Sequence, residues 1–336
     1  MLSISSIQNA GSTTANALGT PSIGANSIIN IATSATLKYT GAANGSSDRV
    51  VRLASATGGT FTLDASGSTP FNLTGGITSA GTSGVSILIL IGNGSGTESG
   101  VIANGSGTNI TAVTKNGGGI WALGGGNSYT GDTTVNAGTL VVGGIVVGNT
   151  IVSGGTLVVG GTISGSTNVN TGGTLASDNG NGTLTNVNIN SGGTLSPGGG
   201  GGIGTFTVNG DLNLNGSSIF SVQFDSTATA VDGITLNGNL NIASGATLNV
   251  SDIGSNPSSI FDVAAPIVTY SGAWNGGTFA GLPDDSYFMS AGQAYQISYD
   301  GGVVTLTMLA VIPEPGSAVS LLGGLGLLLG VRRRRA

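Results

Sequence analysis

The chain has 336 residues, of which 64 are Gly, and only 7% of them carry charge, against about 25% in ordinary globular proteins. It has no Cys and no His, which excludes disulfides, cysteine nucleophiles, Ser-His-Asp triads and nearly all zinc, iron and haem sites. The formal charge is −6, and four of the eight basic residues stand together at positions 332–335, so we expect no nucleic-acid partner. Because 38% of the chain is apolar, it is too apolar for a disordered protein, and its recurring Val, Ile, Leu and Thr predict an all-β fold with glycine turns.

The N-terminus lacks the features of an export signal. Residues 1–8 have no positively charged start and no apolar stretch of signal-peptide length. Because the C-terminus indicates export, as argued below, we expect the true start to lie upstream or the chain to be a fragment.

A short phrase recurs through the middle of the chain: an aliphatic residue, two small or polar residues, Gly-Gly and Thr-Leu. It occurs at residues 151–157, 169–175 and 189–195, with variants at 135–140 and 242–248. Leu140, Leu157, Leu175 and Leu195 follow one another at near-constant intervals, and this period suits one turn of a β-solenoid. The Gly-Gly pair would form a corner, and alternating Leu and Val would face inward. At about 18–20 residues per turn, residues 1–308 would make about 15–17 turns and a rod of about 70–80 Å.

A second arrangement stays open at this point. The chain has ten Asn-Gly dipeptides, which favour tight turns and would also serve antiparallel hairpins packed as a β-sandwich. The near-constant repeat over residues 135–195 favours the solenoid.

Residues 114–140 carry a longer pattern of regularly placed Gly, Thr, Asn and Tyr. It is similar to the autotransporter-associated β-strand repeat, also called the passenger-associated transport repeat. The matching positions are Thr114, Lys115, Gly117, Gly119, Leu123, Gly125, Asn127, Tyr129, Thr130, Gly131, Thr133, Val135, Gly138, Thr139 and Leu140. The resemblance implies a right-handed parallel β-helix outside the cell, and residues 37–67 and 195–212 look like companions of this repeat. Autotransporters end in a membrane barrel, which residues after 300 do not resemble, so export through a barrel of its own is not expected.

Two aromatic residues lie inside this pattern. Trp121 and Tyr129, together with Leu123, could form an aromatic binding patch. The spacing favours structural use, and we expect at least one of the pair to pack against the solenoid wall.

Carboxylates decide whether an enzyme is plausible, because polysaccharide lyases and glycosidases gather acidic residues with Lys or Arg on one face. Here the acids are scattered, and Asp284-Asp285 is the only adjacent pair. It follows Gly281-Leu-Pro283, and adjacent strand residues face opposite sides, so we expect a solvated turn. Asp48-Arg49 with Arg52 could hold a ligand, but we expect a surface ladder pair.

Two loops resemble binding loops only in part. Residues 178–182 begin like an oxygen-ligand calcium loop, but Ile189 stands where the ligand Glu would be. The glycines of residues 198–202 precede a strand-like stretch and no helix, so a phosphate loop is unsupported. We therefore expect no catalytic, cofactor-binding or metal-binding residues.

The C-terminal segment, residues 311–336, combines three features in a fixed order. The first is a rigid segment, Pro313, Glu314 and Pro315, because proline fixes φ and lacks an amide donor. The second is an uncharged apolar run at residues 316–331, which would span about 24 Å as a helix. The third is a basic end, made of Arg332, Arg333, Arg334 and Arg335.

This order predicts one short transmembrane helix with a cytoplasmic membrane stop. The helix falls short of a bilayer core of about 30 Å, and snorkelling arginines can make up the deficit. The positive-inside rule keeps Arg332–Arg335 in the cytoplasm and places the body outside. A buried C-terminal helix with a basic cap is the alternative, which four glycines within the run disfavour.

The three features resemble the PEP-CTERM sorting signal of bacterial exported proteins: a Pro-Glu-Pro motif, a short transmembrane helix and an Arg-rich end. The resemblance covers only the C-terminal tail. It implies processing by an exosortase, a membrane-embedded transpeptidase-like enzyme, and a transient anchor in the inner membrane.

These observations predict two parts, a right-handed parallel β-helix (β-solenoid) over residues 1–308 and a sorting signal over residues 309–336. We interpret the chain as a non-enzymatic exported protein of the cell surface or extracellular matrix, without cofactors. Its expected partners are an exosortase, the inner membrane and exopolysaccharide, in adhesion or biofilm. The alternative is a polysaccharide-active β-helix enzyme, either a lyase or a glycosidase.

Overall fold

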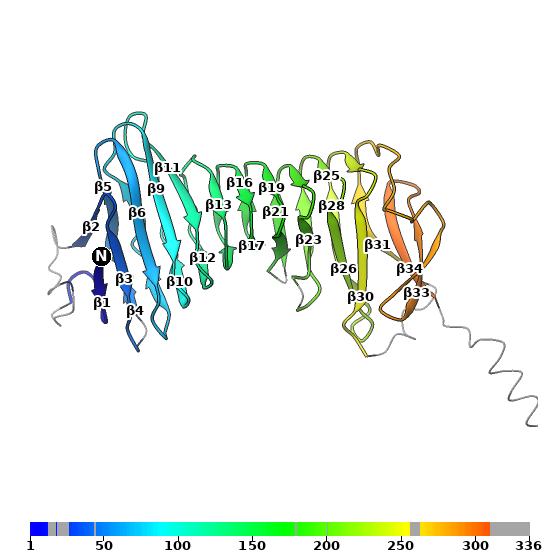
Figure 1. Ribbon diagram of the computed structural model, residues 1–336, viewed down its shortest axis with the longest axis horizontal. Helices are drawn as coiled ribbons and strands as arrows, with labels where there is room; N and C mark the ends of the chain where they lie inside the picture. The colour runs from blue at the N-terminus through cyan, green and yellow to red at the C-terminus, as the bar shows by residue number, and fades with distance from the viewer. Residues whose placement is uncertain are drawn as a thin grey trace, which may run out of the picture.

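The computed structural model describes residues 1–12, 18, 27–43, 45–178, 180–199, 201–255 and 263–309. Within these ranges every helix or strand is a β-strand. The strands stack side by side into an elongated molecule, and the chain advances along it from one end to the other (Figure 1). The all-β prediction is confirmed.

Two long sheets form two walls of the molecule. The first sheet has eleven strands, in the order β1 (Leu2–Ile4), β3 (Thr36–Tyr39), β6 (Gly58–Ala65), β9 (Val85–Ile91), β11 (Ile110–Lys115), β13 (Thr133–Val135), β16 (Thr150–Val152), β19 (Thr167–Val169), β22 (Val187–Ile189), β25 (Leu212–Leu214) and β29 (Leu240–Ile242). The second sheet also has eleven: β4 (Gly45–Ser47), β7 (Phe71–Leu73), β10 (Ser95–Glu98), β12 (Ile120–Leu123), β14 (Thr139–Val142), β17 (Gly155–Val159), β20 (Gly173–Ser177), β23 (Thr194–Ser196), β26 (Ile219–Asp225), β27 (Ala230–Val231) and β30 (Thr247–Asp252).

The third wall is built from two sheets. A short sheet near the N-terminal end contains β2 (Ile28–Ala32), β5 (Val50–Ala54) and β8 (Ile77–Ser79). The third sheet contains β15 (Ile145–Val146), β18 (Thr162–Ile163), β21 (Asn181–Leu184), β24 (Thr205–Val208), β28 (Gly233–Leu236), β31 (Ala264–Tyr270), β34 (Val303–Leu309), β33 (Gln293–Ser298) and β32 (Tyr287–Ser290). Single bridges, Ile77 to Ile102 and Gly126 to Ile145, lie between the two.

The chain visits the three walls in rotation, and each strand pairs in parallel with the equivalent strand of the next turn. The repeated Leu residues show this register, because Leu140, Leu157, Leu175 and Leu195 are direct partners along the second sheet. All four are buried, with at most 1% of their surface exposed. The parallel solenoid is therefore confirmed for the body, and a sandwich of hairpins does not describe it.

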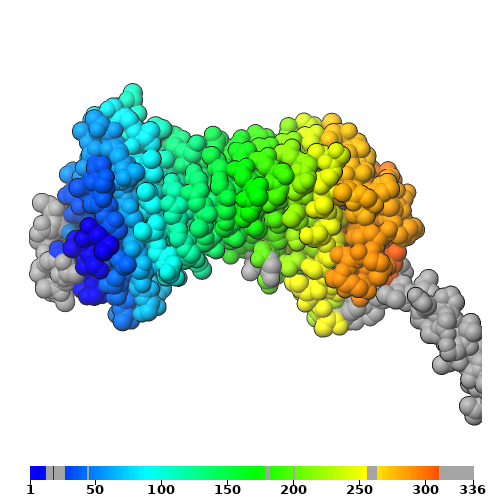
Figure 2. All heavy atoms as spheres, viewed as in Figure 1, coloured from blue at the N-terminus to red at the C-terminus, as the bar shows by residue number. Residues whose placement is uncertain are grey.

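The number of turns is smaller than the sequence predicted. Val135 pairs with Val152 in the first sheet across a short turn, whereas Leu63 pairs with Leu90 across a much longer one. The repeat period reflects the short turns alone, so the estimate of about 15–17 turns is wrong. Eleven strands at a spacing of about 4.8 Å give a sheet about 50 Å across, not 70–80 Å. The short turns lie in the middle of the chain, and Figure 2 shows that the body is narrowest there.

An antiparallel cap closes the C-terminal end of the described solenoid. Here β31 pairs with β34, β34 with β33, and β33 with β32, all antiparallel. Aromatic rings of this region pack on rings of β26, with centroid distances of 6.1 Å for Phe220 and Phe279 and 5.7 Å for Phe224 and Tyr295. Parallel pairing continues after residue 252 through β31, which pairs with β28, and through a single bridge between Leu240 and Trp274. The antiparallel strands that follow cover the end of the core. The predicted right-handedness of the coil stays a prediction.

Candidate functional site

The predicted sorting residues lie outside the described ranges. These are Pro313, Glu314, Pro315 and the membrane stop Arg332–Arg335, together with the apolar run at residues 316–331. Among the residues that are described, none belongs to a helix with the length and hydropathy needed to cross a membrane.

The motif that begins at Thr114 is described in full, and its lysine is buried. Lys115 points into the core, in register between Leu90 and Val135, with 0% of its surface exposed. Its Nζ donates to three carbonyl oxygens, those of Asn116 at 3.1 Å, Gly117 at 2.8 Å and Ala137 at 3.0 Å. These three bonds use all the donors of the ammonium group. Burial lowers the pKa of Lys115 to about 8, so the group is still mainly protonated at pH 7 and ties one turn to the next.

Asn127 links three consecutive turns where the third wall has no regular strand. Its Oδ1 accepts a hydrogen bond from the backbone N–H of Ile102 at 2.9 Å. Its Nδ2 donates to Gly125 O at 3.0 Å and to Ile145 O at 2.9 Å. The amide is buried, with 2% of its surface exposed, and its bonds add to the few backbone bonds that join the turns between β8 and β15.

The aromatic residues of the motif are core residues and not a binding patch. Trp121, Leu123 and Tyr129 each have 0% of their surface exposed. Trp121 donates from Nε1 to Ile91 O at 2.9 Å, and its ring meets Phe71 edge-on at a centroid distance of 6.2 Å. The Tyr129 hydroxyl bonds to Thr133 Oγ1 at 2.6 Å. The expectation of structural use is confirmed for both aromatic residues.

Glycines of the motif allow the turns to approach closely. A Cβ on Gly125 would overlap the backbone carbonyl of Gly100 in the preceding turn, whereas a Cβ on Gly126 would meet nothing within 4 Å. A Cβ on Gly138 would lie 2.7 Å from Lys115 Nζ. Gly125 and Gly138 therefore leave room for a neighbouring backbone and for the buried ammonium group.

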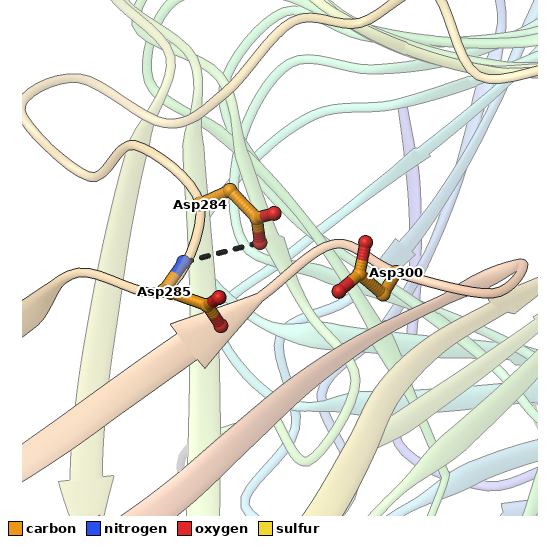
Figure 3. Close-up of side chains that lie close together, drawn as sticks. All are labelled: Asp284, Asp285 and Asp300. Carbon is orange, nitrogen blue, oxygen red and sulfur yellow. Dashed lines mark hydrogen bonds between the residues drawn. The ribbon is translucent and has the colours of Figure 1, made fainter.

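Three exposed carboxylates come together on the cap, those of Asp284, Asp285 and Asp300, with oxygen atoms within 4.8 Å of one another (Figure 3). Asp284 acts as a turn acceptor: its Oδ1 accepts from the backbone N–H of Asp285 at 3.1 Å and of Tyr299 at 2.9 Å. This arrangement agrees with the predicted solvated turn. In the part of the chain that the structure describes, no Lys or Arg follows Lys115.

The predicted ladder pair at Asp48-Arg49 is wrong. Asp48 Oδ1 accepts from Ala10 N at 2.6 Å, while Arg49 is 6% exposed and reaches Ile28 O only at 3.5 Å. Arg52 bonds instead to Asn30 Oδ1, at 2.8 Å, in the neighbouring strand of the short sheet. Adjacent residues point to opposite sides of a strand end, which separates the acid from the base that follows it.

At the loop of residues 178–182, which begins like a calcium-binding loop, Asp178 is exposed and Asn179 lies outside the described residues.

Sequence reasoning missed two acids that have no exposed surface, Glu98 and Asp232. Glu98 lies in the inner column of the second sheet between Leu73 and Leu123, with 0% exposed. Its Oε1 accepts from Gly100 N at 2.8 Å. Burial raises the pKa of Glu98 to about 7, against the smaller effect of the backbone N–H groups of Gly100 and Gly76, which lower it. Asp232, just before β28, is equally buried. The sequence did contain a signal for Glu98. In β10 every second side chain points inward, and Glu98 stands at one of these inward positions.

The outer faces carry long rows of uncharged polar side chains. On the first sheet, amide-to-amide hydrogen bonds of 2.8–2.9 Å connect two rows, Asn168–Asn188–Asn213–Asn241 and Asn170–Asn190–Asn215. On the third sheet the register aligns Thr162, Thr183, Thr207, Thr235 and Thr269. Each row alternates with buried aliphatic residues, so it faces solvent.

Comparison with known families gives one match, and the matched residues can be placed on the strands described above. Residues 113–142 match the family model described as Passenger-associated-transport-repeat. A search of curated proteins gave no match to the chain. The matched segment runs from within β11 through β12, β13 and β14, and it contains Lys115, Trp121, Asn127 and Tyr129. The chain thus carries a passenger-associated transport repeat, which indicates a secreted or surface protein of the passenger type.

Proposed function

We propose that the chain is a non-enzymatic exported protein of the cell surface or extracellular matrix, a right-handed solenoid that serves as a rod-shaped scaffold. The observation that carries this proposal is how the repeat uses its polar and aromatic residues. Lys115, Asn127 and Tyr129 are buried and bonded within the solenoid. Side chains used in this way hold turns together and are not available to a substrate.

The tail supplies the sorting step of this proposal. Pro313, Glu314 and Pro315 would stay extended outside the inner membrane, where an exosortase could reach them. Residues 316–331 would span the bilayer, and Arg332–Arg335 would stop transfer in the cytoplasm. The support for this step is the order of the three features in the sequence.

Exopolysaccharide is the partner that suits the outer surface best. The rows of Asn and Thr offer amides and hydroxyls at the strand spacing of about 4.8 Å, which can exchange hydrogen bonds with a hydroxyl-rich polymer. Residues 116–331 contain no basic side chain, so a nucleic-acid partner is not supported. Attachment to such a polymer would place the protein in adhesion or biofilm.

A polysaccharide panel separates the scaffold from an enzyme. The purified protein is incubated with neutral and acidic polysaccharides, and both retention on the polymer and release of reducing ends are measured. The proposal expects retention without release. Release that disappears in Asp284→Ala, but persists in the exposed control Asp178→Ala, would show that the cap carries an active site.

The sorting step has its own test, intact mass of the protein recovered from an exosortase-positive host and from the same host without the enzyme. Cleavage near Pro313–Pro315 should appear only in the first host. Changing Pro313, Glu314 and Pro315 to Ala should retain the full-length chain in the inner membrane. A secreted form whose mass still includes residues 316–336 would contradict the sorting step.

A further inference from the structure

One buried carboxylate in the second half of the solenoid has no basic residue to balance it. Residues 116–331 contain no Lys, Arg or His. Among the acids described in this stretch, only Asp232 is buried, with 0% of its surface exposed. An uncompensated charge in such a place is costly unless something else neutralises it.

Backbone N–H groups donate hydrogen bonds to the Asp232 carboxylate, but they carry no positive charge that would balance it. Its Oδ1 accepts from Gly204 N at 2.8 Å and its Oδ2 from Gln223 N at 3.0 Å. The backbone N–H of Gly198 also favours the ionised form of this carboxylate and so lowers its pKa. Burial nevertheless raises the pKa of Asp232 above its usual range, since desolvation outweighs the three N–H donors.

Two further oxygens face the same corner. Gln223 is 7% exposed, and its Oε1 has no hydrogen-bond partner. A Cβ placed on Gly198 would lie 2.5 Å from Gln223 Oε1 and 2.7 Å from Asp232 Oδ1, and it would overlap the carbonyl oxygen of Gly202. Three acceptor oxygens thus converge in this corner, and one of them, Gln223 Oε1, is buried without a donor.

We propose that a calcium ion binds in this corner, coordinated by the Asp232 carboxylate, Gln223 Oε1 and the carbonyl oxygen of Gly202. Carboxylate, amide and backbone oxygens are the ligands that calcium prefers, and water completes its coordination shell of about six to eight. Gly199 and Gly201, which precede Gly202 in the chain, are exposed. The bound ion neutralises Asp232 and fixes the glycine loop to β26. This site departs from the sequence expectation of no metal.

A competing account needs no ion. If the Gln223 side-chain amide were turned by half a rotation, Nε2 would replace Oε1 and could donate to Asp232 Oδ1 and Gly202 O, a difference that lies in the assignment of two similar atoms. The two accounts differ in one respect that can be measured, which is the response of the protein to calcium.

The test uses the full chain, stripped with a chelator and titrated with calcium alone. Calorimetry should give one ion per chain with a Kd of about 10⁻⁴–10⁻³ M, and calcium should raise Tm by a few degrees. Asp300→Asn, which weakens the exposed acidic cluster on the cap, should keep both effects. Asp232→Asn and Gln223→Leu should lose them, and Gln223→Glu, which adds a charged ligand, should bind calcium more tightly.

Two results would overturn the site. One is the absence of calcium binding to the wild-type chain, which would favour the rotated amide. The other is binding that is lost in Asp300→Asn, which would assign the ion to the cap. Should Asp232→Asn fail to fold, the stoichiometry in the wild-type chain and in Asp300→Asn still decides between these outcomes.

Discussion

At the scale of single residues, buried polar side chains link neighbouring turns of this solenoid. Disulfides supply such cross-links in many secreted proteins. The chain has no Cys, and its turns are joined by buried side chains such as Lys115 and Asn127. Each of them bonds to backbone groups of a neighbouring turn. Buried polar groups with satisfied hydrogen bonds fix one arrangement of the chain, because any shift of register would leave them unpaired.

Glu98 should make the stability depend on pH. Burial raises its pKa from 4.5 to about 7 in the folded protein, so the folded state holds more protons than the unfolded state between these values. The free energy of unfolding should therefore fall as pH rises from about 4.5 to 7, by up to about 3 kcal/mol. Denaturant unfolding at pH 5 and pH 8 measures the difference.

Glu98→Gln is the control for this pH effect. The amide keeps the shape and cannot ionise, so the variant should show a smaller fall over the same interval. Asp232, whose pKa burial also raises, accounts for part of the fall that remains. Lys115 does not interfere, since its pKa of about 8 lies below the usual 10.5 and its effect, a gain in stability as pH rises, belongs to the interval above pH 8. An unchanged pH dependence in Glu98→Gln would remove this residue from the explanation.

Trp121 should contribute strongly to stability, although it lies in a glycine-rich segment. Trp121→Ala removes a side chain that is 0% exposed and should lower the free energy of unfolding by about 3–5 kcal/mol. Its sequence neighbour Ile120 is 47% exposed, so Ile120→Ala should have a much smaller effect. Thermal melting of both variants checks this; equal effects would mean that Trp121 is not packed in the core.

At the scale of the elements, the turns differ in length while the strands keep their register. In the first sheet Val152 and Val169 are partners across a short turn, and Leu214 and Ile242 are partners across a much longer one. Part of the additional length lies in longer strands, such as β9 and β26 with seven residues each against three in β13. The rest lies in the loops between walls, which can lengthen without disturbing the ladders. A period read from the shortest turns therefore overestimates the number of turns.

The corner glycines of the repeat should differ sharply in their tolerance of a side chain. Gly125→Ala would drive a methyl group into the carbonyl of Gly100, so we expect a loss of about 1–3 kcal/mol or more, because backbone must move apart. Gly126→Ala adds the same methyl group in open space and should leave the stability within about 1 kcal/mol of the wild type. Chemical denaturation of the pair checks this, and a neutral Gly125→Ala would show that the turns are less close than described.

At the scale of the whole molecule, the sequence was sufficient for the repetitive part and insufficient where repetition stops. The phrase around Leu157 and Leu175 predicted the parallel register, since identical residues stack in identical environments. The cap was missed because β32, β33 and β34 share no repeat with the body, and their antiparallel pairing depends on contacts between distant residues such as Phe224 and Tyr295.

The residues of the candidate site also differ in how well the sequence predicted them. The motif pattern pointed to structural use of Trp121 and Tyr129, which burial confirms. Asp232 gave no such signal, because its surroundings include residues distant in the sequence, such as Gly204, whose N–H donates to its carboxylate. A lone acid in a chain is uninformative until the fold shows which groups surround it.

Hydrogen exchange followed by mass spectrometry tests the central claim, a continuous parallel solenoid scaffold, most directly. The account predicts slow exchange in the strands of all three walls from β9 to β26, except β15 at the end of its sheet, because each of the others has paired strands in the turns on both sides. Exchange should be faster at β1, β2 and β4, which lie at the ends of their sheets and have unpaired edges. Fast, uniform exchange across residues 85–225 would contradict the solenoid and the function proposed for it.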